Sequence, residues 1–203
     1  MQGKDLSGIH IEGHIKIYDP KTQEVFINKR NAIHYENMSV ALAESIANTG
    51  QGFIYEIAFG NGGTTVDPTG IITYLTPNST GTSATLYNET YRKVIDDRSV
   101  TNLDPVRNKI ETRHVTGTNY TDVFITCLLD YGEPQGQDAF DNTTNNDSDF
   151  VFDELGLRSY SPTGNGKLLT HVIFHPVQKS LNRLIQIDYT VRIQSLTGLS
   201  EVA

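Results

Sequence analysis

The sequence lacks the residues that give small proteins covalent cross-links. It contains one cysteine and no tryptophan in 203 residues. Because Cys127 is alone, an intrachain disulfide cannot form, and a thiolate metal site is excluded. Cys127 lies within an apolar run, 123–129, so we expect a buried, unreactive thiol rather than a nucleophile.

Long hydrophobic runs and an excess of positive charge are also missing. No apolar stretch approaches the roughly 20 residues that a membrane helix needs, and no apolar segment typical of a signal peptide follows the first residues. Sixteen Lys and Arg face 24 Asp and Glu, which gives a net charge of −8. Such a chain is poorly suited to nucleic acid or an anionic membrane, so we expect neither as a partner and expect folding in a cytoplasm-like compartment.

What the sequence does contain is a strong period of two. Isoleucines at 9, 11, 15 and 17 alternate with polar residues, which predicts a half-buried strand. Residues 19–22 form a turn, and 24–27 return as the second arm of a hairpin. Further strands are expected at 53–59, 71–75, 91–95, 109–115, 122–131, 150–157, 168–175 and 184–193.

One segment, 38–47, is predicted to be helical. Asn37 is the expected N-cap, and Gly50 follows the end of the helix. Met38, Leu42 and Ile46 share one face, which we expect to pack on the sheet.

Many short strands separated by polar turns predict a mainly β protein, an antiparallel β-sandwich with one short α-helix and long polar loops. No linker divides the chain, so 1–203 is expected to be one domain. Within it, 1–50 form an N-terminal hairpin and helix, 51–194 form the sandwich, and 195–203 form a C-terminal tail. The loop 132–148 is long, polar and acidic, and we expect an exposed arm.

Histidine spacing gives no metal site within one chain. His10 and His14 are four residues apart, as are His171 and His175. On a helix such pairs converge on one ion, but along a strand four residues span about 13 Å. We therefore expect solvated or capping histidines; a metal shared on a symmetry axis stays open.

Other catalytic and binding motifs are incomplete. A calcium loop starting at Asp141 has Asn146 where an EF-hand needs glycine, and Phe152 where it needs a carboxylate. The glycine-rich segment 60–65 has no P-loop lysine and no following helix, so turns that need positive φ explain its glycines better. No nucleophile elbow or Cys/His arrangement is present. We predict no enzyme, no catalytic residue, no metal ligand and no cofactor.

The order of the remaining motifs is more informative. They are IYEIAFGNG at 54–62, LYNETYR at 86–92, FDELGL at 152–157 and GKLLTH at 166–171. This succession resembles the N-terminal domain of tail-collar fibre proteins of contractile-tailed bacteriophages. That family has an I-x-x-I-x-x-G-x-G turn, an L-x-N-E-x-x-R strand and an E-x-G-L strand followed by a G-x-L-L hairpin. The chain, including 31–34 and 175–180, is also similar to virion structural proteins of T-even-like phages of cyanobacteria.

The resemblance implies a non-enzymatic structural component of a tailed phage particle. We expect an oligomeric adaptor in the tail, baseplate or neck, whose partners are further copies of itself and fibre or other virion subunits. The family's shaft and receptor-binding tip have no counterpart in these residues, so receptor binding is not carried over. The shared motif residues are expected to be structural: Gly60, Gly62, Asn88, Glu89, Arg92, Glu154 and Gly156.

Two of these motifs place charges within apolar strands. We hypothesise that Arg92 forms a partly buried bidentate ion pair with Glu154 or Glu89, joining two strands. The alternative is that all three are ordinary surface charges, whose pairing contributes about 0–1 kcal/mol.

Loops and sheet edges are the natural contact surfaces of such a subunit. The expected contact arms are 61–67, 77–85 and 132–148, with the following residues as contacts: Asn61, Thr64, Asp67, Pro77, Thr82, Gln135, Asp141 and Asn145. The main alternative function is a capsid decoration protein. A host-glycan-binding module is a third possibility, disfavoured because tryptophan is absent and most tyrosines fall within predicted strands.

Overall fold

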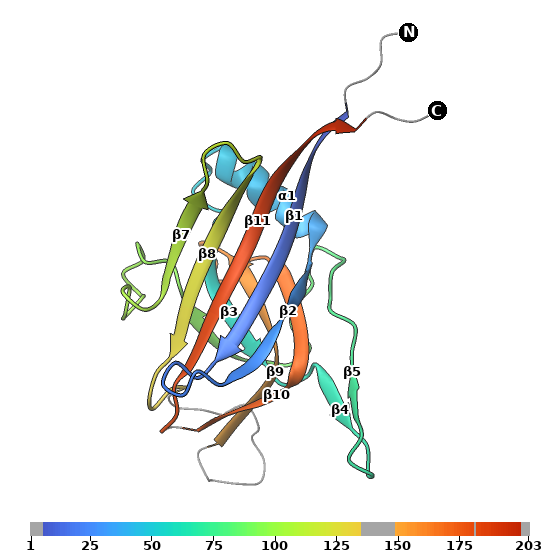
Figure 1. Ribbon diagram of the computed structural model, residues 1–203, viewed down its shortest axis with the longest axis vertical. Coiled ribbons are helices and arrows are strands. Elements are labelled where there is room, and N and C mark those ends of the chain that lie inside the picture. The colour runs from blue at the N-terminus through green and yellow to red at the C-terminus, as the bar shows by residue number, and fades with distance from the viewer. Residues whose placement is uncertain (1–5, 135–148, 181, 200–203) are drawn as a thin grey trace.

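The computed structural model describes residues 6–134, 149–180 and 182–199. These residues form a mainly β protein with one helix (Figure 1). The elements are β1 (Leu6–Tyr18), β2 (Val25–Ile33), α1 (Tyr35–Ile46), β3 (Ile54–Gly60), β4 (Thr64–Val66), β5 (Ile72–Tyr74), β6 (Glu89–Val94), β7 (Lys109–His114), β8 (Tyr120–Leu129), β9 (Asp149–Ser159), β10 (Thr170–Ser180) and β11 (Ile185–Leu199).

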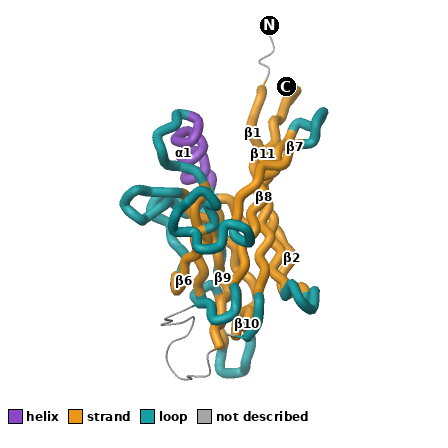
Figure 2. Tube along the Cα trace, turned by 90° about the vertical axis from the view of Figure 1, so that its left-hand side faces the viewer, coloured by secondary structure: helices purple, strands orange, loops and turns teal. Residues whose placement is uncertain are grey.

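Nine strands form one antiparallel sheet in the order β6-β3-β9-β10-β2-β1-β11-β8-β7. The sheet curls so that its two halves face each other across the core (Figures 1 and 2). The bend lies where β10 meets β2, since those strands share only the pairs Thr170–Ile33 and His171–Ala32. The predicted mainly β, antiparallel sandwich is therefore confirmed, in the form of a curled sheet that remains open along one side.

The core fills the space between the two halves. Phe152 is central to it, because its ring packs edge-on against Phe59 and Phe174, with centroids 5.6 and 5.7 Å away. Both halves contribute fully buried side chains, as alternation along half-buried strands requires. Those from β1, β8 and β11 include Ile15, Ile17, Ile125, Cys127, Ile187 and Tyr189; those from β3 and β9 include Ile57, Phe59, Leu155 and Leu157.

Cys127 has the environment that its sequence context predicts. Its side chain is free and fully buried, and burial raises the pKa of the thiol to about 12. A thiol that stays protonated across the neutral range is a poor nucleophile.

The helix is present, but its start was predicted wrongly. It begins at Tyr35, and the N-cap is His34, whose Nδ1 accepts a hydrogen bond from the amide of Asn37. Asn37 lies in the first turn and is buried, where its side chain donates to the carbonyl of Leu168 at 2.9 Å. Ile46 is 84% exposed, so it does not share the buried face of Met38.

The strands at 9–17, 24–27 and the eight later positions all have counterparts among the described residues. The sequence missed β4, a three-residue strand in the glycine- and threonine-rich segment, which pairs with β5 in a separate two-stranded hairpin. This hairpin projects from the curled sheet (Figure 1).

The predicted C-terminal tail begins too early. β11 continues through residues 195–199 and pairs with the start of β1, where Leu6 faces Leu199. Residues 200–203 lie outside the described part of the chain. The N-terminal hairpin is likewise part of the large sheet, since β1 lies between β2 and β11.

Candidate functional site

A fully buried carboxylate on β9 joins three distant segments of the chain. Glu154 Oε1 accepts hydrogen bonds from the backbone amides of Gly62 at 3.1 Å and Asn88 at 2.8 Å. Its Oε2 accepts from the amide of Tyr87 and from His171 Nε2, both at 2.9 Å. We call Glu154, its neighbour Asp153, His171 and the amides that they bind the Glu154 junction.

Asp153 extends the junction toward the projecting hairpin. It accepts from the amides of Gly63 at 2.9 Å and Thr64 at 2.8 Å, and also from the Thr64 hydroxyl. Two adjacent carboxylates thus bind consecutive amides at the root of β4. Burial raises the pKa of Asp153, and the hydrogen bonds from Thr64 and Gly63 offset only part of that rise.

The hydrogen bonds of His171 define its tautomer. Its Nδ1 accepts from the amide of Asn78 at 2.8 Å, so Nε2 carries the proton and donates to Glu154. Burial alone raises the pKa of Glu154, but the hydrogen bonds from His171, Asn88 and Tyr87 outweigh burial and lower the pKa below its ordinary value of 4.5. The junction therefore holds an ionised glutamate against a buried imidazole.

The predicted role of the histidines is correct for His10, His14 and His175, which are exposed, and wrong for His171, which is fully buried. A carboxylate inside the protein needs donors, and His171 supplies one. The sequence gives one signal for this burial, because Glu154 and His171 each lie in a segment rich in apolar residues, 150–157 and 168–174.

The shared glycines are required by close approach rather than by backbone conformation. Positive φ was expected at Gly60 and Gly62, but neither has it. A Cβ on Gly60 would lie 2.4 Å from the Asn88 carbonyl oxygen, and one on Gly62 would lie 2.7 Å from the Asn88 nitrogen. Both glycines let 60–62 pass directly against the 87–88 segment, beside Glu154.

Gly156 offers a direct test of this close packing. A Cβ there would lie 2.3 Å from the carbonyl oxygen of Thr170 and 2.6 Å from Leu168 Cδ1. We expect Gly156→Ala to lower the free energy of unfolding by about 1–3 kcal/mol, measured by urea denaturation. Gly8→Ala is the matched control, since a Cβ on Gly8 in β1 meets nothing within 4 Å. Equal stability of the two variants would contradict the packing argument.

Arg92 pairs with Glu89 and not with Glu154. Its Nε contacts the Glu89 carboxylate, and its Nη1 lies 3.4 Å from Glu56 Oε1. Of the two partners proposed from the sequence, Glu89 is thus correct, although the contact is not bidentate. It does not join two strands as predicted, because Glu89 and Arg92 both lie on β6; the contact with Glu56 on β3 does. Glu154 is wrong because its oxygens are taken by three amides and His171.

The same ion cluster contains a residue that the sequence did not single out. Arg158 on β9 is 4% exposed, and its Nη2 lies 3.1 Å from Glu89 Oε2. Its Nη1 donates to the carbonyl of Gly166 at 3.2 Å. Burial lowers the pKa of Arg158 and raises that of Glu56, and the opposite charges in the cluster partly offset both shifts.

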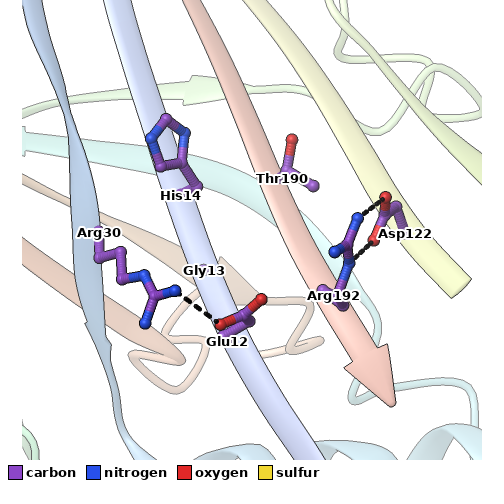
Figure 3. Close-up of a pocket in the computed structure, with 7 residues that line it drawn as sticks. All are labelled: Glu12, Gly13, His14, Arg30, Asp122, Thr190 and Arg192. Carbon is purple, nitrogen blue, oxygen red and sulfur yellow. Dashed lines mark hydrogen bonds and ion pairs between the residues drawn. The ribbon is translucent and has the colours of Figure 1, made fainter. Parts of the chain in front are cut away.

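A polar cleft of about 320 Å³ lies on the outer face of the central strands (Figure 3). Arg192 on β11 makes two hydrogen bonds to Asp122 on β8, at 2.8 and 2.9 Å. On the other side of the cleft, Arg30 of β2 lies 3.5 Å from Glu12 of β1. The hydrogen bond with Asp122 raises the pKa of Arg192, so both remain ionised. Each arginine in the cleft has a carboxylate beside it, which favours a charge-balanced contact surface over an anion site.

The contact arms divide into anchored and projecting parts. Asn61 and Thr64 belong to the root of the hairpin and are tied to Asn88 and Asp153. Asp67 is exposed at the hairpin's turn, where its carboxylate accepts from the amides of Thr69 and Ile71. The arm 61–67 is therefore fixed at its base and exposed at its tip.

The second arm, 77–85, is held at several points. Pro77 is half-buried and Thr82 is exposed. Asn78 is bound to His171 through its amide, and its side chain donates to Thr85 O at 2.8 Å. His34 Nε2 lies 2.9 Å from Gly81 O. In the third arm, Gln135, Asp141 and Asn145 lie outside the described residues.

Acid should weaken the Glu154 junction selectively. Because folding lowers the pKa of Glu154, its contribution to stability is present above the unfolded value near 4.5 and is lost as the pH falls through the lower folded value. We expect the stability difference between the wild type and Glu154→Gln to be larger at pH 7 than at pH 3.5, as measured by urea denaturation. Comparing the two proteins at each pH removes the contributions of acids that do not interact with Glu154. A difference independent of pH would contradict the assignment of an ionised Glu154.

Neither a metal-binding group nor a membrane span is found in the described part of the chain. No three or more His, Cys, Asp and Glu residues there are placed to hold a metal ion. None of its helices has the length and apolar character needed to cross a membrane. No protein-family model matches the chain, and comparisons with curated proteins and with solved structures found no match.

Proposed function

We propose that this chain is a non-enzymatic structural component of a tailed phage particle. In this proposal it is an oligomeric adaptor in the tail, neck or baseplate, to which fibres or neighbouring virion proteins dock. Its location is the virion, and its partners are further copies of itself and other virion subunits.

The observation that carries the proposal is the convergence of the shared motifs. The glycine turn at 60–62, the strand motif at 86–92 and the E-x-G-L strand meet at Glu154, and the G-x-L-L segment supplies His171. Sequence features spread over more than half of the chain thus serve one junction. If the resemblance reflects a shared fold and not chance, the shared motifs should meet in space, as these do.

The placement of the junction supports a role in presenting a contact element. The amides that Asp153 and Glu154 bind belong to the base of the β4–β5 hairpin, which projects from the sheet (Figure 1). Val66 and Tyr74 on this hairpin are 61% and 51% exposed. A rigid root that carries exposed apolar residues suits docking.

The same junction is unsuited to catalysis. Glu154 and His171 are both 0% exposed, and their polar atoms are bound to other parts of the chain. A general acid or base must come within hydrogen-bond distance of its substrate. The acid and base are therefore better explained as structural.

Immunogold labelling of intact particles, viewed by electron microscopy, tests the proposal. We expect gold at the neck or the tail end of particles from the phage that encodes this chain. Gold distributed over the head would instead indicate a capsid decoration protein and contradict the adaptor role. Particles without the chain, as judged by both labelling and mass spectrometry of purified virions, would overturn a virion role altogether.

A further inference from the structure

The open side of the curled sheet carries an unusual exposed apolar loop. β6 and β7 are the two edges of the nine-stranded sheet, and the residues between them cross the opening. Figure 2 faces this side of the molecule. In this crossing loop Val100, Leu103 and Val106 are 97%, 96% and 78% exposed. Exposure of three such side chains in one loop marks a contact surface.

The loop is held in shape without help from these apolar side chains. The buried Asn102 donates to the carbonyls of Asp96 at 3.2 Å and Asn108 at 2.8 Å. The buried Asn108 accepts from the amide of Leu128 at 2.9 Å and donates to Asp104 O at 3.1 Å. Because two buried amides fix the backbone, the apolar residues are presented at little further cost in conformational entropy when they bind.

An apolar cavity of about 210 Å³ opens beside the loop. Arg98, two residues before Val100, lines this cavity, and its guanidinium lies 5.3 Å from the centroid of the Phe53 ring. The cavity walls come from α1 and from strands of both halves of the sheet and include Met38, Leu42, Phe53, Ile54, Ile110 and Val123. One face of the molecule thus carries an apolar projection and an apolar recess side by side.

We propose that two copies of this chain associate through this open-side face, with the 100–106 loop of each copy lying over the cavity of the other and the Leu103 side chain inserted into it. A two-fold contact requires one patch that is complementary to itself, and a projection next to a recess meets that requirement. A cavity of about 150 Å³ already holds a benzene molecule. The 210 Å³ recess therefore has room for the side chain of Leu103.

The rest of the face has the composition of an interface. Phe53 stacks on Tyr160 with centroids 5.0 Å apart, and Tyr55 lies edge-on to Tyr160 at 5.1 Å. The Tyr55 hydroxyl lies 2.9 Å from Thr101 Oγ1, which joins this aromatic cluster to the loop. Tyrosine and phenylalanine are enriched in the buried centres of protein interfaces.

Ion pairs near the loop reduce the repulsion between two copies. A net charge of −8 makes two copies repel each other unless the contact is locally neutral. Near the loop, Arg98 lies 2.9 Å from Asp96, and Arg107 lies 2.5 Å from Asp130 and also contacts Asp104. Each cation of the face is paired within its own copy, but acids outnumber cations there, since Asp97 lies beside Arg98 and Arg107 contacts two aspartates. The dimer should therefore become tighter as added salt screens the remaining repulsion.

Sedimentation velocity over a range of protein concentrations tests the proposal. We expect the wild type to dimerise and Leu103→Asp to raise the dissociation constant at least about 30-fold, as loss of a central contact residue does. Leu103 is 96% exposed in the single chain, so the variant should fold. Val25→Asp is the matched control, since Val25 is an exposed apolar residue on β2, which lies away from both edges of the large sheet. A wild type that stays monomeric, or a dimer that Leu103→Asp leaves unchanged, would overturn the proposal.

Disulfide trapping identifies the contact itself. Cys127 is the only native cysteine in the sequence and is buried, so introduced thiols report without interference. Chains carrying Leu103→Cys are mixed with differently tagged chains carrying Ser45→Cys, an exposed position that lines the cavity. Oxidation should join the two tags at least about tenfold more often than it joins Leu103→Cys chains to Val25→Cys chains, since Val25 is exposed on β2, away from the proposed face. Equal yields would exclude the proposed packing.

These tests use the purified protein and do not depend on the virion role. A dimer whose chain is absent from particles would leave this inference intact and overturn the proposed function. A chain that is monomeric in solution but labels the tail would overturn this inference and leave the proposed place in the virion intact.

Discussion

Replacing Glu154 by alanine is expected to lower the free energy of unfolding by about 3–5 kcal/mol. The variant removes a fully buried carboxylate, so that the part-buried amides of Gly62, Tyr87 and Asn88 lose their acceptor and the fully buried His171 loses its partner. Breaking one buried charged interaction costs about this much, because the remaining polar groups stay desolvated. For a chain of this size, Tm should fall by about 10 °C.

Urea denaturation followed by circular dichroism measures this loss, and Glu24→Ala is its control. Glu24 is exposed, and its side chain pairs only with Arg183 at the surface, so its removal should cost about 1 kcal/mol or less. Amide exchange gives a local readout. The amides of 62–64 and 87–88 should exchange faster in Glu154→Ala, in conditions where the protein remains folded. Unchanged exchange rates at these amides would contradict the role of Glu154 in holding the two segments.

The second large effect is expected at Arg158 rather than at Arg92. Arg158→Ala leaves Glu89 partly buried beside a void, and we expect a loss of about 3–5 kcal/mol. Arg92 contacts the same glutamate but its side chain is 34% exposed, so water compensates for much of its removal. Arg92→Ala should therefore cost only about 1 kcal/mol.

A double-mutant cycle separates the ion pair from simple loss of packing. The combined Arg158→Ala and Glu89→Ala variant should be more stable than the sum of the two single losses predicts. Glu89→Ala alone leaves the buried Arg158 without this carboxylate, and the double variant does not carry that cost. Additive losses would mean that Arg158 acts through its volume alone. If Arg92→Ala is as unstable as Arg158→Ala, the burial of the two side chains does not determine their contributions to stability.

The strands were predictable because their periodicity is local. In β1 the alternation of isoleucines with polar residues is set by one buried face, and the structure buries Ile11, Ile15 and Ile17 as expected. Ile9 belongs to the same predicted pattern but is exposed. β4 was missed because Thr64–Val66 has no such pattern. Its strand geometry comes from pairing with β5 and from the hydrogen bonds of Thr64 to Asp153.

The Glu154 junction was only partly predictable. The motifs pointed to its residues. Which acid pairs with which donor depends, however, on distances between segments, and these distances cannot be read from the sequence. Arg92 and Glu154 are both charges in apolar strands, yet only the fold shows that Arg92 faces Glu89. His34 was missed as an N-cap because Asn37 is the more common capping residue, and Asn37 instead supports Leu168 inside the protein.

The pairing of β1 with β11 has a consequence for biosynthesis. Ile11 is bound beside Ile193, so neighbouring strands at the middle of the sheet come from nearly opposite ends of the sequence. During translation the β1–β2 hairpin emerges before β10 and β11, and its two outer edges stay unpaired until those strands leave the ribosome. Contacts this distant in sequence slow folding and leave strand edges open to wrong partners. The central sheet should therefore close only after β11 has been synthesised. Until then, newly made chains should depend on chaperones.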